Sequence, residues 1–458
     1  MIFQWPDKIK IDYVWEHLKM CFLLPEELER RFSYGEKSPE SSSIIFNLSE
    51  EKLSANVVWI DKIPLLFPIG KESRVYAIIN GHLEFHHDIL KSAFYLLSGY
   101  QEYTSSEKDH FNRFPFSSSV QKKHNIATLP VVNYYFHWIA EALNAYARYH
   151  NLPAVEKKTF AANGKFSFFL SHDVDRVDYY TVNEIIFSAK QLLGFSPSKN
   201  NKAHSLKLML DGIWNYLFTR KNPDWDFGHL ISIEKKYHIA ATYFFLDKDL
   251  MHQDAYYDIR ESRIEKLINW LKEHDAEIGL HGVCRSSTDE AIMQKQHHKL
   301  WQVLNENPSG VRQHRLMYRN PETLLIHEKT GFLYDTTLGF AEHEGFRNAF
   351  CHPFKLFDHD NNRITDVWEF PLNVMDVTLF YYQNYNLAEA KQAVHSILEE
   401  VCKFNGLFTV LWHNGFNNEK KIRGITEFYE GLIRDVTEMG GEGIAGSDLV
   451  KRLEGFAG

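Results

Sequence analysis

Short apolar runs alternate with helical stretches from about residue 165 to the end of the chain. Apolar and β-branched content between turn signals predicts strands at residues 166–171, 240–246, 277–281, 310–315, 333–337, 367–372, 408–413 and 443–445. Amphipathic periodicity predicts helices between them, for example at residues 263–274 and 387–404. This alternation indicates a parallel sheet built from βα units. If the sheet closes into a barrel, its chemistry is expected at the carboxyl ends of the strands.

The first 160 residues form a separate region in this pattern. Helices are predicted at residues 12–20, 88–97 and 134–149, and strands at residues 43–48, 57–60, 65–68 and 75–79. A stretch rich in Pro, Gly and polar residues at 151–164 is the predicted hinge. We therefore expect an α+β domain at 1–160 and a (β/α) domain at 161–458. The first contains no catalytic constellation, and its expected role is packing, oligomerisation or shaping of a substrate groove.

Within the second region, residues 180–225 form a long segment with Lys and Asn runs. This segment is predicted to be a helical insertion that caps one side of the functional site.

Composition and charge narrow the class of protein. The 458 residues are 44% hydrophobic and 24% charged, which is typical of a soluble globular protein of two or three domains. The net charge of −9 argues against nucleic acid as the main partner, because phosphate binding needs a basic surface. No apolar run approaches the ~20 residues that span a bilayer, and no signal peptide is evident. The sequence indicates no oligomeric state.

The four cysteines are far apart and include no Cys-x-x-Cys pair. Neither a disulfide framework nor a structural zinc site is expected, and a reducing compartment is indicated. A cytoplasmic location is therefore expected.

Two carboxylates end the first strand of the second region, in the run Ser171-His172-Asp173-Val174-Asp175. Residues i and i+2 of a strand share a face, so Asp173 and Asp175 should project together. Adjacent carboxylates are costly unless a cation or a proton separates them. The pair is a candidate for a metal ligand beside a general base, and the alternative is an acidic loop without a chemical role.

Three later strands also deliver reactive side chains at their ends. His281 is favoured as a ligand because it repeats the strand-end position of Asp175, whereas Cys284 is more simply a buried thiol. Arg312 could orient a carboxylate and lower its pKa, or it could form a structural salt bridge. His413 could act as a general acid–base if a nearby carboxylate adjusts the pKa of its ring. The acidic residues at or near strand ends that could do so are Asp335, Asp366 and Glu369.

From about residue 165 onward, the chain resembles the polysaccharide deacetylases of carbohydrate esterase family 4, the NodB-homology fold. The resemblance rests on an ordered series of motifs: Ser171-His172-Asp173-Val174-Asp175, Leu280-His281, Gly310-Val311-Arg312 and Leu411-Trp412-His413. It implies a deformed (β/α) barrel that acts as a metal-dependent amide hydrolase, here with an extra N-terminal domain.

The resemblance also implies roles for individual residues. Asp173 matches the general base, and Asp175 and His281 match metal ligands. Arg312 matches the arginine that orients the base, and His413 matches the general acid. The implied cofactor is a divalent metal, with zinc as the expected ion.

One position departs from the family pattern. Arg285 stands four residues after His281, where the family has its second metal-binding histidine. Asp175 and His281 remain as matched ligands, whereas a catalytic zinc normally takes three ligands from the protein. Arg285 could itself replace the metal as a fixed cation. Otherwise, the third ligand could be water or one of the side chains of His314, Cys284 and Ser286.

These observations favour a hydrolase that removes N-acetyl groups from an N-acetylated sugar in a polysaccharide or glycan precursor. The expected substrate contacts are Trp412, Asp335 and His314. A related hydrolase acting on another C–N bond, in an amide or a cyclic ureide, is a second hypothesis. A degenerate barrel that binds a glycan or a partner protein without catalysis is a third. Product analysis separates the first two, and metal analysis tests the third.

Overall fold

A computed structural model describes residues 5–35, 43–49, 53, 57–178, 185–186, 189–190, 192–193, 202–219, 222, 224–248, 254–419 and 421–457. Its largest element is a ten-stranded sheet. The strands are β9 (Phe166–Val174), β10 (Ala241–Leu246), β11 (Glu277–Gly282), β12 (Gly310–Gln313), β13 (Tyr334–Asp335), β14 (Phe354–Asp358), β15 (Arg363–Glu369), β16 (Val374–Met375), β17 (Leu407–Leu411) and β18 (Gly441–Gly443).

The sheet follows the order β14-β15-β13-β12-β11-β10-β9-β17-β16, and β18 pairs with β9. All pairings are parallel except that of β14 with β15. Among the described residues, β14 and β16 are not paired with each other, so the sheet curls without closing. The expected deformed (β/α) barrel is confirmed. The short strand β16 and the antiparallel strand β14 were not predicted.

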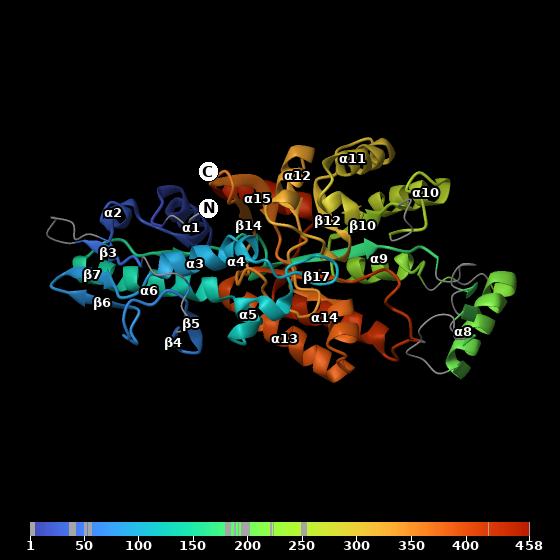
Figure 1. Cartoon of the computed structure of the whole chain (residues 1–458), viewed down its shortest axis with the longest axis horizontal. Helices are drawn as coiled ribbons and strands as arrows, with labels where there is room; N and C mark the ends of the chain where they lie inside the picture. The colour runs from blue at the N-terminus through green and yellow to red at the C-terminus, as the bar shows by residue number, and fades with distance from the viewer. Residues whose placement is uncertain are drawn as a thin grey trace.

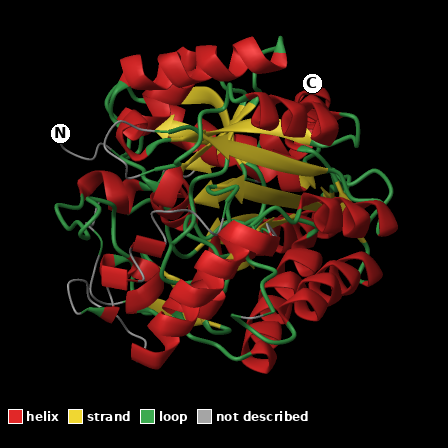
Figure 2. Ribbon diagram, turned by 90° about the vertical axis from the view of Figure 1, so that its right-hand side faces the viewer, coloured by secondary structure: helices red, strands yellow, loops and turns green. Residues whose placement is uncertain are grey.

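Helices pack around this sheet, as Figure 2 shows. They are α9 (Phe227–Lys236), α10 (Ser262–Lys272), α11 (Glu290–Leu304), α12 (Glu322–Thr330), α13 (Leu387–Phe404), α14 (Ile425–Glu438) and α15 (Gly446–Ala457). α13 begins at a capping box formed by Asn386 and Glu389, and its apolar stripe faces the core. Side chains of α15 fill the end of the sheet interior opposite the site, where Leu449 and Val450 cluster with Tyr334.

The central strand β9 has two different buried faces. Phe166, Phe168 and Leu170 join the cluster under the outer helices, whereas Phe169 joins the interior cluster. This alternation continues to the end of the strand, so Asp173 and Asp175 lie on the interior face, as the two-residue period predicts. His172 lies on the outer face, where its ring contacts the backbone oxygen of Trp412.

The N-terminal region is an α+β unit, as expected. It contains the helices α1 (Lys8–Cys21), α3 (Ile89–Leu97) and α6 (Val131–His150). Its sheet has the order β2-β3-β7-β6 and is formed by β2 (Phe32–Tyr34), β3 (Ile44–Phe46), β7 (His82–Phe85) and β6 (Tyr76–Ile79). Figure 1 shows this region at one end of an elongated molecule.

One hydrophobic cluster joins the N-terminal region to the edge of the barrel. Tyr13 of α1 packs edge-on against Phe357 of β14, with ring centroids 5.2 Å apart, and its hydroxyl donates to the backbone oxygen of Lys355 at 2.9 Å. Phe94 of α3 contacts the same Phe357 ring at 5.1 Å. The two regions are therefore packed on each other, and the domain boundary near residue 160 stays a prediction.

The predicted insertion at 180–225 contains the helix α8 (Lys202–Trp214), which Figure 1 places at the end of the molecule opposite α2 (Glu26–Glu29). Much of the rest of this segment lies outside the described residues. In the part of the chain that is described, no helix has the length and apolar character needed to cross a membrane.

A buried ion pair also connects the two regions, and it provides a test of their coupling. The Arg347 guanidinium donates two hydrogen bonds to the Glu102 carboxylate, at 2.7 and 2.6 Å. We expect Arg347→Ala to lower the free energy of unfolding by about 3–5 kcal/mol, because it leaves the buried Glu102 charge unpaired. The measurement is denaturant unfolding followed by circular dichroism.

The exposed pair Arg30–Glu26 gives the matched control. Arg30→Ala should change the same free energy by less than about 0.5 kcal/mol. Equal effects of the two substitutions would contradict a coupled interface.

Candidate active site

A cleft opens at the carboxyl ends of the barrel strands. It consists of two adjoining cavities of about 230 and 290 Å³, and both are lined by Asp175, Val377 and His413. The register of the parallel strands places their carboxyl ends side by side. Asp173 pairs with Phe244 of β10, and His281 of β11 pairs with Arg312 of β12. Five of the predicted site residues line the cleft, namely Asp173, Asp175, His281, His314 and His413, and Arg312 lies directly behind them.

Arg312 holds Asp173 in place. The guanidinium donates to the Asp173 carboxylate from Nη1 at 2.8 Å and to the backbone oxygen of Thr336 from Nε at 3.0 Å. It also stacks over the Phe244 ring, 4.8 Å from the centroid. Arg312 is fully buried and Asp173 nearly so. One oxygen of Asp173 is thereby fixed by a cation, and the other faces His281 at 3.4 Å.

Asp175, His281 and His314 form a cluster with the chemistry of a metal site. One donor atom from each lies within 4.8 Å of the others. Nε2 of His281 is 3.3 Å from one Asp175 oxygen, and Nε2 of His314 is 3.8 Å from the other. Two imidazoles and one carboxylate are a ligand set that catalytic zinc accepts.

The second nitrogen of each imidazole has its own partner. Nδ1 of His281 lies 2.8 Å from the backbone oxygen of Arg312, and Nδ1 of His314 contacts the Asp254 carboxylate. A neutral ring that donates from Nδ1 presents the lone pair of Nε2, which is the atom that faces Asp175 in both cases. One oxygen of Asp175 is also buried without a hydrogen-bond partner. These residues fit a divalent cation.

The charge of Asp175 is set by the rings around it. Burial alone would raise the pKa of Asp175, but His314, His281 and His413 lower it well below its usual range. Asp175 therefore remains ionised at neutral pH.

His413 is tied to a carboxylate that the sequence did not indicate. Nδ1 of His413 lies 2.7 Å from Asp376, and the His413 backbone N–H donates to the other Asp376 oxygen at 2.6 Å. Burial alone would lower the pKa of His413, but Asp376 and Asp175 raise it to about 10. Nε2 of His413 points into the cleft, 3.6 Å from Asp175, so a protonated ring faces the cluster.

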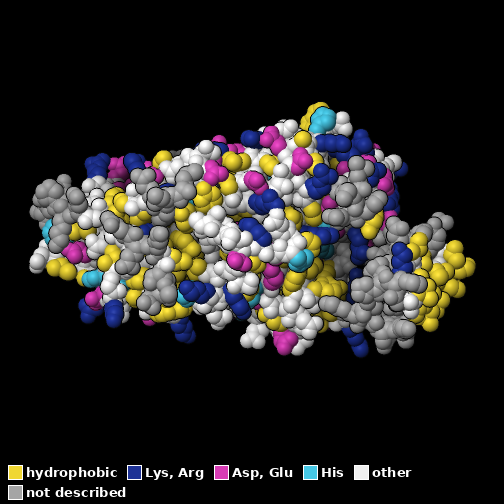
Figure 3. Space-filling view, viewed as in Figure 1, with side chains coloured by type: hydrophobic (Ala, Val, Ile, Leu, Met, Phe, Trp, Pro, Cys, Tyr) yellow, Lys and Arg dark blue, Asp and Glu magenta, His cyan; other side chains and the backbone are white. Residues whose placement is uncertain are grey.

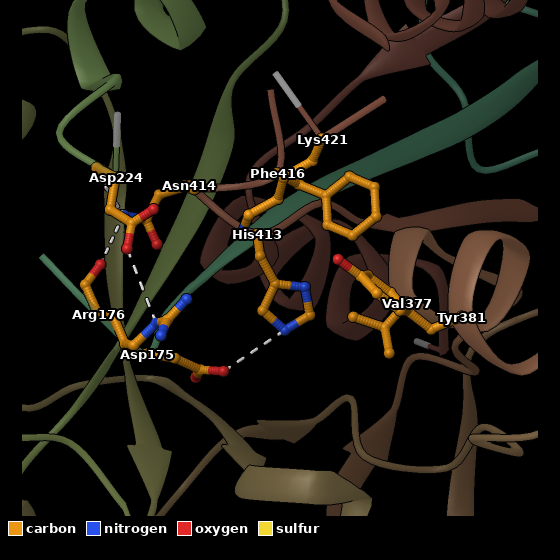
Figure 4. Close-up of a pocket in the computed structure, with 10 residues that line it drawn as sticks. Asp175, Arg176, Asp224, Val377, Tyr381, His413, Asn414, Phe416 and Lys421 are labelled. Atoms are coloured by element: carbon orange, nitrogen blue, oxygen red, sulfur yellow. Dashed lines mark hydrogen bonds and ion pairs between the residues drawn. The ribbon is translucent and has the colours of Figure 1, made fainter. Parts of the chain in front are cut away.

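Figure 4 shows the second cavity around His413. The ring of His413 faces Asp175, and Arg176 and Asp224 form an ion pair on one side of the cavity at 3.7 Å. The other side is lined by the aromatic side chains of Tyr381 and Phe416. The cavity thus combines a charged wall with an aromatic wall.

The N-terminal region contributes to the first cavity. Phe111 and Arg113 line it, together with Tyr382 and Leu316 from the barrel region. Phe111 lies between two guanidinium groups, 5.1 Å from Arg113 and 5.0 Å from Arg315. The expected role of residues 1–160 in shaping a groove therefore has a physical basis in this wall.

Two predicted substrate contacts lie outside the cleft. Trp412 is fully buried, and its indole N–H donates to Asn417 at 2.9 Å on the outer side of the sheet. Asp335 is also fully buried, 3.2 Å from Nδ1 of His327. Neither lines the cleft.

The three acidic residues considered as partners of His413 are corrected as well. Asp335 pairs with His327, Glu369 accepts from the backbone N–H of Leu338, and the Asp366 side chain is 95% exposed. The partner is Asp376, which follows the two-residue strand β16. A strand this short gives no periodicity, so the sequence offered no signal for it.

Arg285 does not take the place of a metal. It is exposed on a 3₁₀ turn (Cys284–Ser287) and lines neither cavity. Burial raises the pKa of the neighbouring Cys284 to about 12, which keeps a free thiol protonated. Ser286 is buried and donates to the backbone oxygen of Val283. Of the side chains considered for the missing ligand position, His314 is the one that reaches Asp175.

Comparison with known proteins gives a family for part of the chain. Residues 9–148 match a protein family of unknown function, DUF7033. None of the curated proteins matches the chain in sequence.

Solved structures resemble the barrel. A proposed polysaccharide deacetylase from Mycobacterium smegmatis has 17% identity and a TM-score of 0.42, over 65% of this chain and 93% of its own. The Puue allantoinase has 12% identity and a TM-score of 0.39, over 64% and 92%. BA3943 from Bacillus anthracis, described as a CE4 family pseudoenzyme, has 11% identity and a TM-score of 0.31, over 63% and 66%. These likenesses span different activities, so the chemistry is argued from the residues of the cleft.

The donor cluster predicts that His314 is required for metal binding. We expect His314→Ala to weaken zinc binding by more than about 100-fold, because one of three donors is removed. The measurement is titration calorimetry of chelator-stripped protein.

Arg285→Ala is the control, since Arg285 lies outside the cluster, and it should leave the zinc affinity unchanged. Wild-type affinity in His314→Ala, or a loss in Arg285→Ala, would rule out this ligand set.

Proposed function

We propose that the protein is a metal-dependent hydrolase that removes N-acetyl groups from an N-acetylated sugar in a glycan or glycan precursor. The observation that carries the proposal is the convergence of Asp175, His281 and His314 within 4.8 Å, next to an Asp173 carboxylate fixed by Arg312 at 2.8 Å. A donor set of this kind beside a buried carboxylate supports metal-assisted hydrolysis.

Asp175, His281 and His314 are the residues that would hold the cation, and zinc is the ion that their chemistry favours. A divalent cation bound there would supply Lewis acidity toward the acetyl carbonyl and lower the pKa of water. The carbonyl group of Arg312 and the carboxylate of Asp254 would keep the two rings oriented for this task.

Asp173 is the proposed general base. Its Arg312 contact keeps one oxygen occupied, while the second oxygen faces the donor cluster. From this position Asp173 can accept a proton from an attacking water molecule.

His413 is the proposed general acid. Asp376 fixes the ring through Nδ1 and favours its protonated form, so that Nε2–H points into the cleft. This proton can be given to the departing amine, which leaves acetate and a free amino sugar as products.

The aromatic residues of the cleft support a sugar as the substrate. Tyr381, Tyr382, Phe416 and Phe111 line the two cavities, and aromatic faces suit the apolar faces of pyranose rings. These side chains replace Trp412 as proposed sugar contacts. The cytoplasmic location expected from the sequence stays a prediction.

Substitution of the base provides the direct test. Asp173→Asn should abolish acetate release from N-acetylated oligosaccharides, because the amide cannot accept the proton of water. The assay measures acetate and ammonia in parallel, with small amides and cyclic ureides as competing substrates. Ammonia from the amides, or a ring-opened acid from the ureides followed in the same assay, without acetate from sugars, would indicate the alternative C–N hydrolase. Acetate release by Asp173→Asn at the wild-type rate would refute the assignment of the base.

A second variant tests the general acid. Asp376→Asn keeps the size of the side chain but removes the charge that holds the proton on His413. We expect kcat to fall by about 100-fold with little change in KM or in zinc affinity. Asp366→Asn is the matched control because the Asp366 side chain is exposed, and it should retain full activity. Similar kcat values for the two variants would remove Asp376 from the mechanism.

A further inference from the structure

The helix α8 and the π-helical turn η2 (Asn215–Thr219) that follows it carry an exposed apolar stripe. The exposed fractions are 54% for Leu210, 59% for Trp214 and 67% for Phe218. We call this surface the α8 stripe, and its members are Leu206, Leu210, Ile213, Trp214, Leu217 and Phe218. In Figure 3, hydrophobic side chains gather at the same end of the molecule.

The stripe faces away from the protein. Leu206, Leu210 and Ile213 recur at intervals of four and three residues, which places them on one side of a helix. Gly212 projects on the opposite side and is buried. A surface helix normally buries its apolar side against the core and exposes its polar side. On α8 the described apolar side chains are exposed instead, which is typical of a surface that binds a partner.

The stripe is carried on a segment that begins and ends at the mouth of the cleft. Arg176 precedes this segment and Asp224 follows it, and both line the cavity that contains His413. Their side chains form an ion pair at 3.7 Å. The segment that carries the stripe is therefore anchored at both ends beside this cavity.

The charge of this segment identifies the kind of surface. Residues 177–223 contain six basic residues and three acidic residues, a net charge of +3 in a chain whose total is −9. A basic segment with Leu, Trp and Phe on one side of a helix matches an anionic lipid surface. Pairing with the same stripe on a second copy would bring two such segments together, which like-charge repulsion opposes.

We propose that the α8 stripe docks the protein on an anionic lipid bilayer. The 13 residues of α8 are too few to span the hydrocarbon core, so the helix lies in the interface. The apolar side chains enter the membrane surface, and the net positive charge of the segment attracts it to the anionic headgroups. This docking is independent of the proposed deacetylation because it requires no turnover.

Vesicle co-sedimentation of the full chain tests the proposal. Wild-type protein should bind vesicles of equal parts phosphatidylcholine and phosphatidylglycerol, and bind pure phosphatidylcholine less, with the difference lost at high salt. Trp214→Ser/Leu217→Ser should lower binding to the mixed vesicles by at least about tenfold, since two exposed apolar anchors are removed.

Trp59→Ser/Leu23→Ser is the matched control. It removes the same residue types at 48% and 53% exposure from the N-terminal region, and it should bind like the wild type. Absence of vesicle binding, or equal loss in both double variants, would overturn the proposal. Light scattering without vesicles gives a second test. A wild-type dimer that becomes a monomer in Trp214→Ser/Leu217→Ser would also overturn the proposal, because the stripe would then bind a second copy of the chain. A hydrolytic assay that fails while vesicle binding persists would refute only the proposed function.

Discussion

Two carboxylates two residues apart, Asp173 and Asp175, project into the same crowded end of the barrel. Burial of unpaired like charges would cost several kcal/mol, so the surrounding residues have to neutralise them. Arg312 does this for Asp173 through a 2.8 Å contact, and three histidine rings surround Asp175. These partners come from β11, from β12 and from the residues that follow β12 and β17, so the parallel pairing of these strands brings them to the two carboxylates.

The three histidines follow one rule although they come from different parts of the chain. Each has Nδ1 against an oxygen, which belongs to the Arg312 backbone, to Asp254 or to Asp376. Each therefore turns Nε2 toward Asp175, at distances of 3.3, 3.8 and 3.6 Å. His281 and His314 become donors for a cation, whereas the charged partner Asp376 makes His413 a proton donor. The partner of Nδ1 thus decides whether a ring is suited to bind a metal ion or to donate a proton.

Residues at or just past the ends of regular strands could be predicted from the sequence, whereas their partners in loops could not. The two-residue period of β9 and the apolar strands before His281, Arg312 and His413 were sufficient to place the strand ends in one cleft. His314 lies past the end of β12, where Arg315 adopts a positive φ of 58°, so alternation did not select it over Cys284 and Ser286 as the third ligand. Asp254 and Asp376 come from a loop and from the end of a two-residue strand, which leave no periodic signal.

Trp412 shows the opposite error. The alternation of the strand placed its side chain on the outer face, but it was predicted to contact substrate because it is aromatic. It is adjacent to His413 and two residues after Val410, whose side chain joins the outer cluster. The period of two therefore placed Trp412 under the helices, where its ring lies 4.9 Å from Tyr429. An aromatic residue next to a reactive histidine is a weak indicator of substrate contact when the strand assigns the two side chains to opposite faces.

Phe111 and Arg113 form one wall of the cleft, and this affects how the protein could evolve. A cleft enclosed by one module can be moved intact to a new partner by recombination of gene segments. Here one wall of the cleft comes from the N-terminal region, and that region shares its hydrophobic cluster with β14 and β15. Inheritance of the barrel alone would deliver an incomplete cleft with an uncovered apolar edge. New specificity in such a chain has to arise by matched substitutions on both sides of the interface, with the whole polypeptide as the unit of selection.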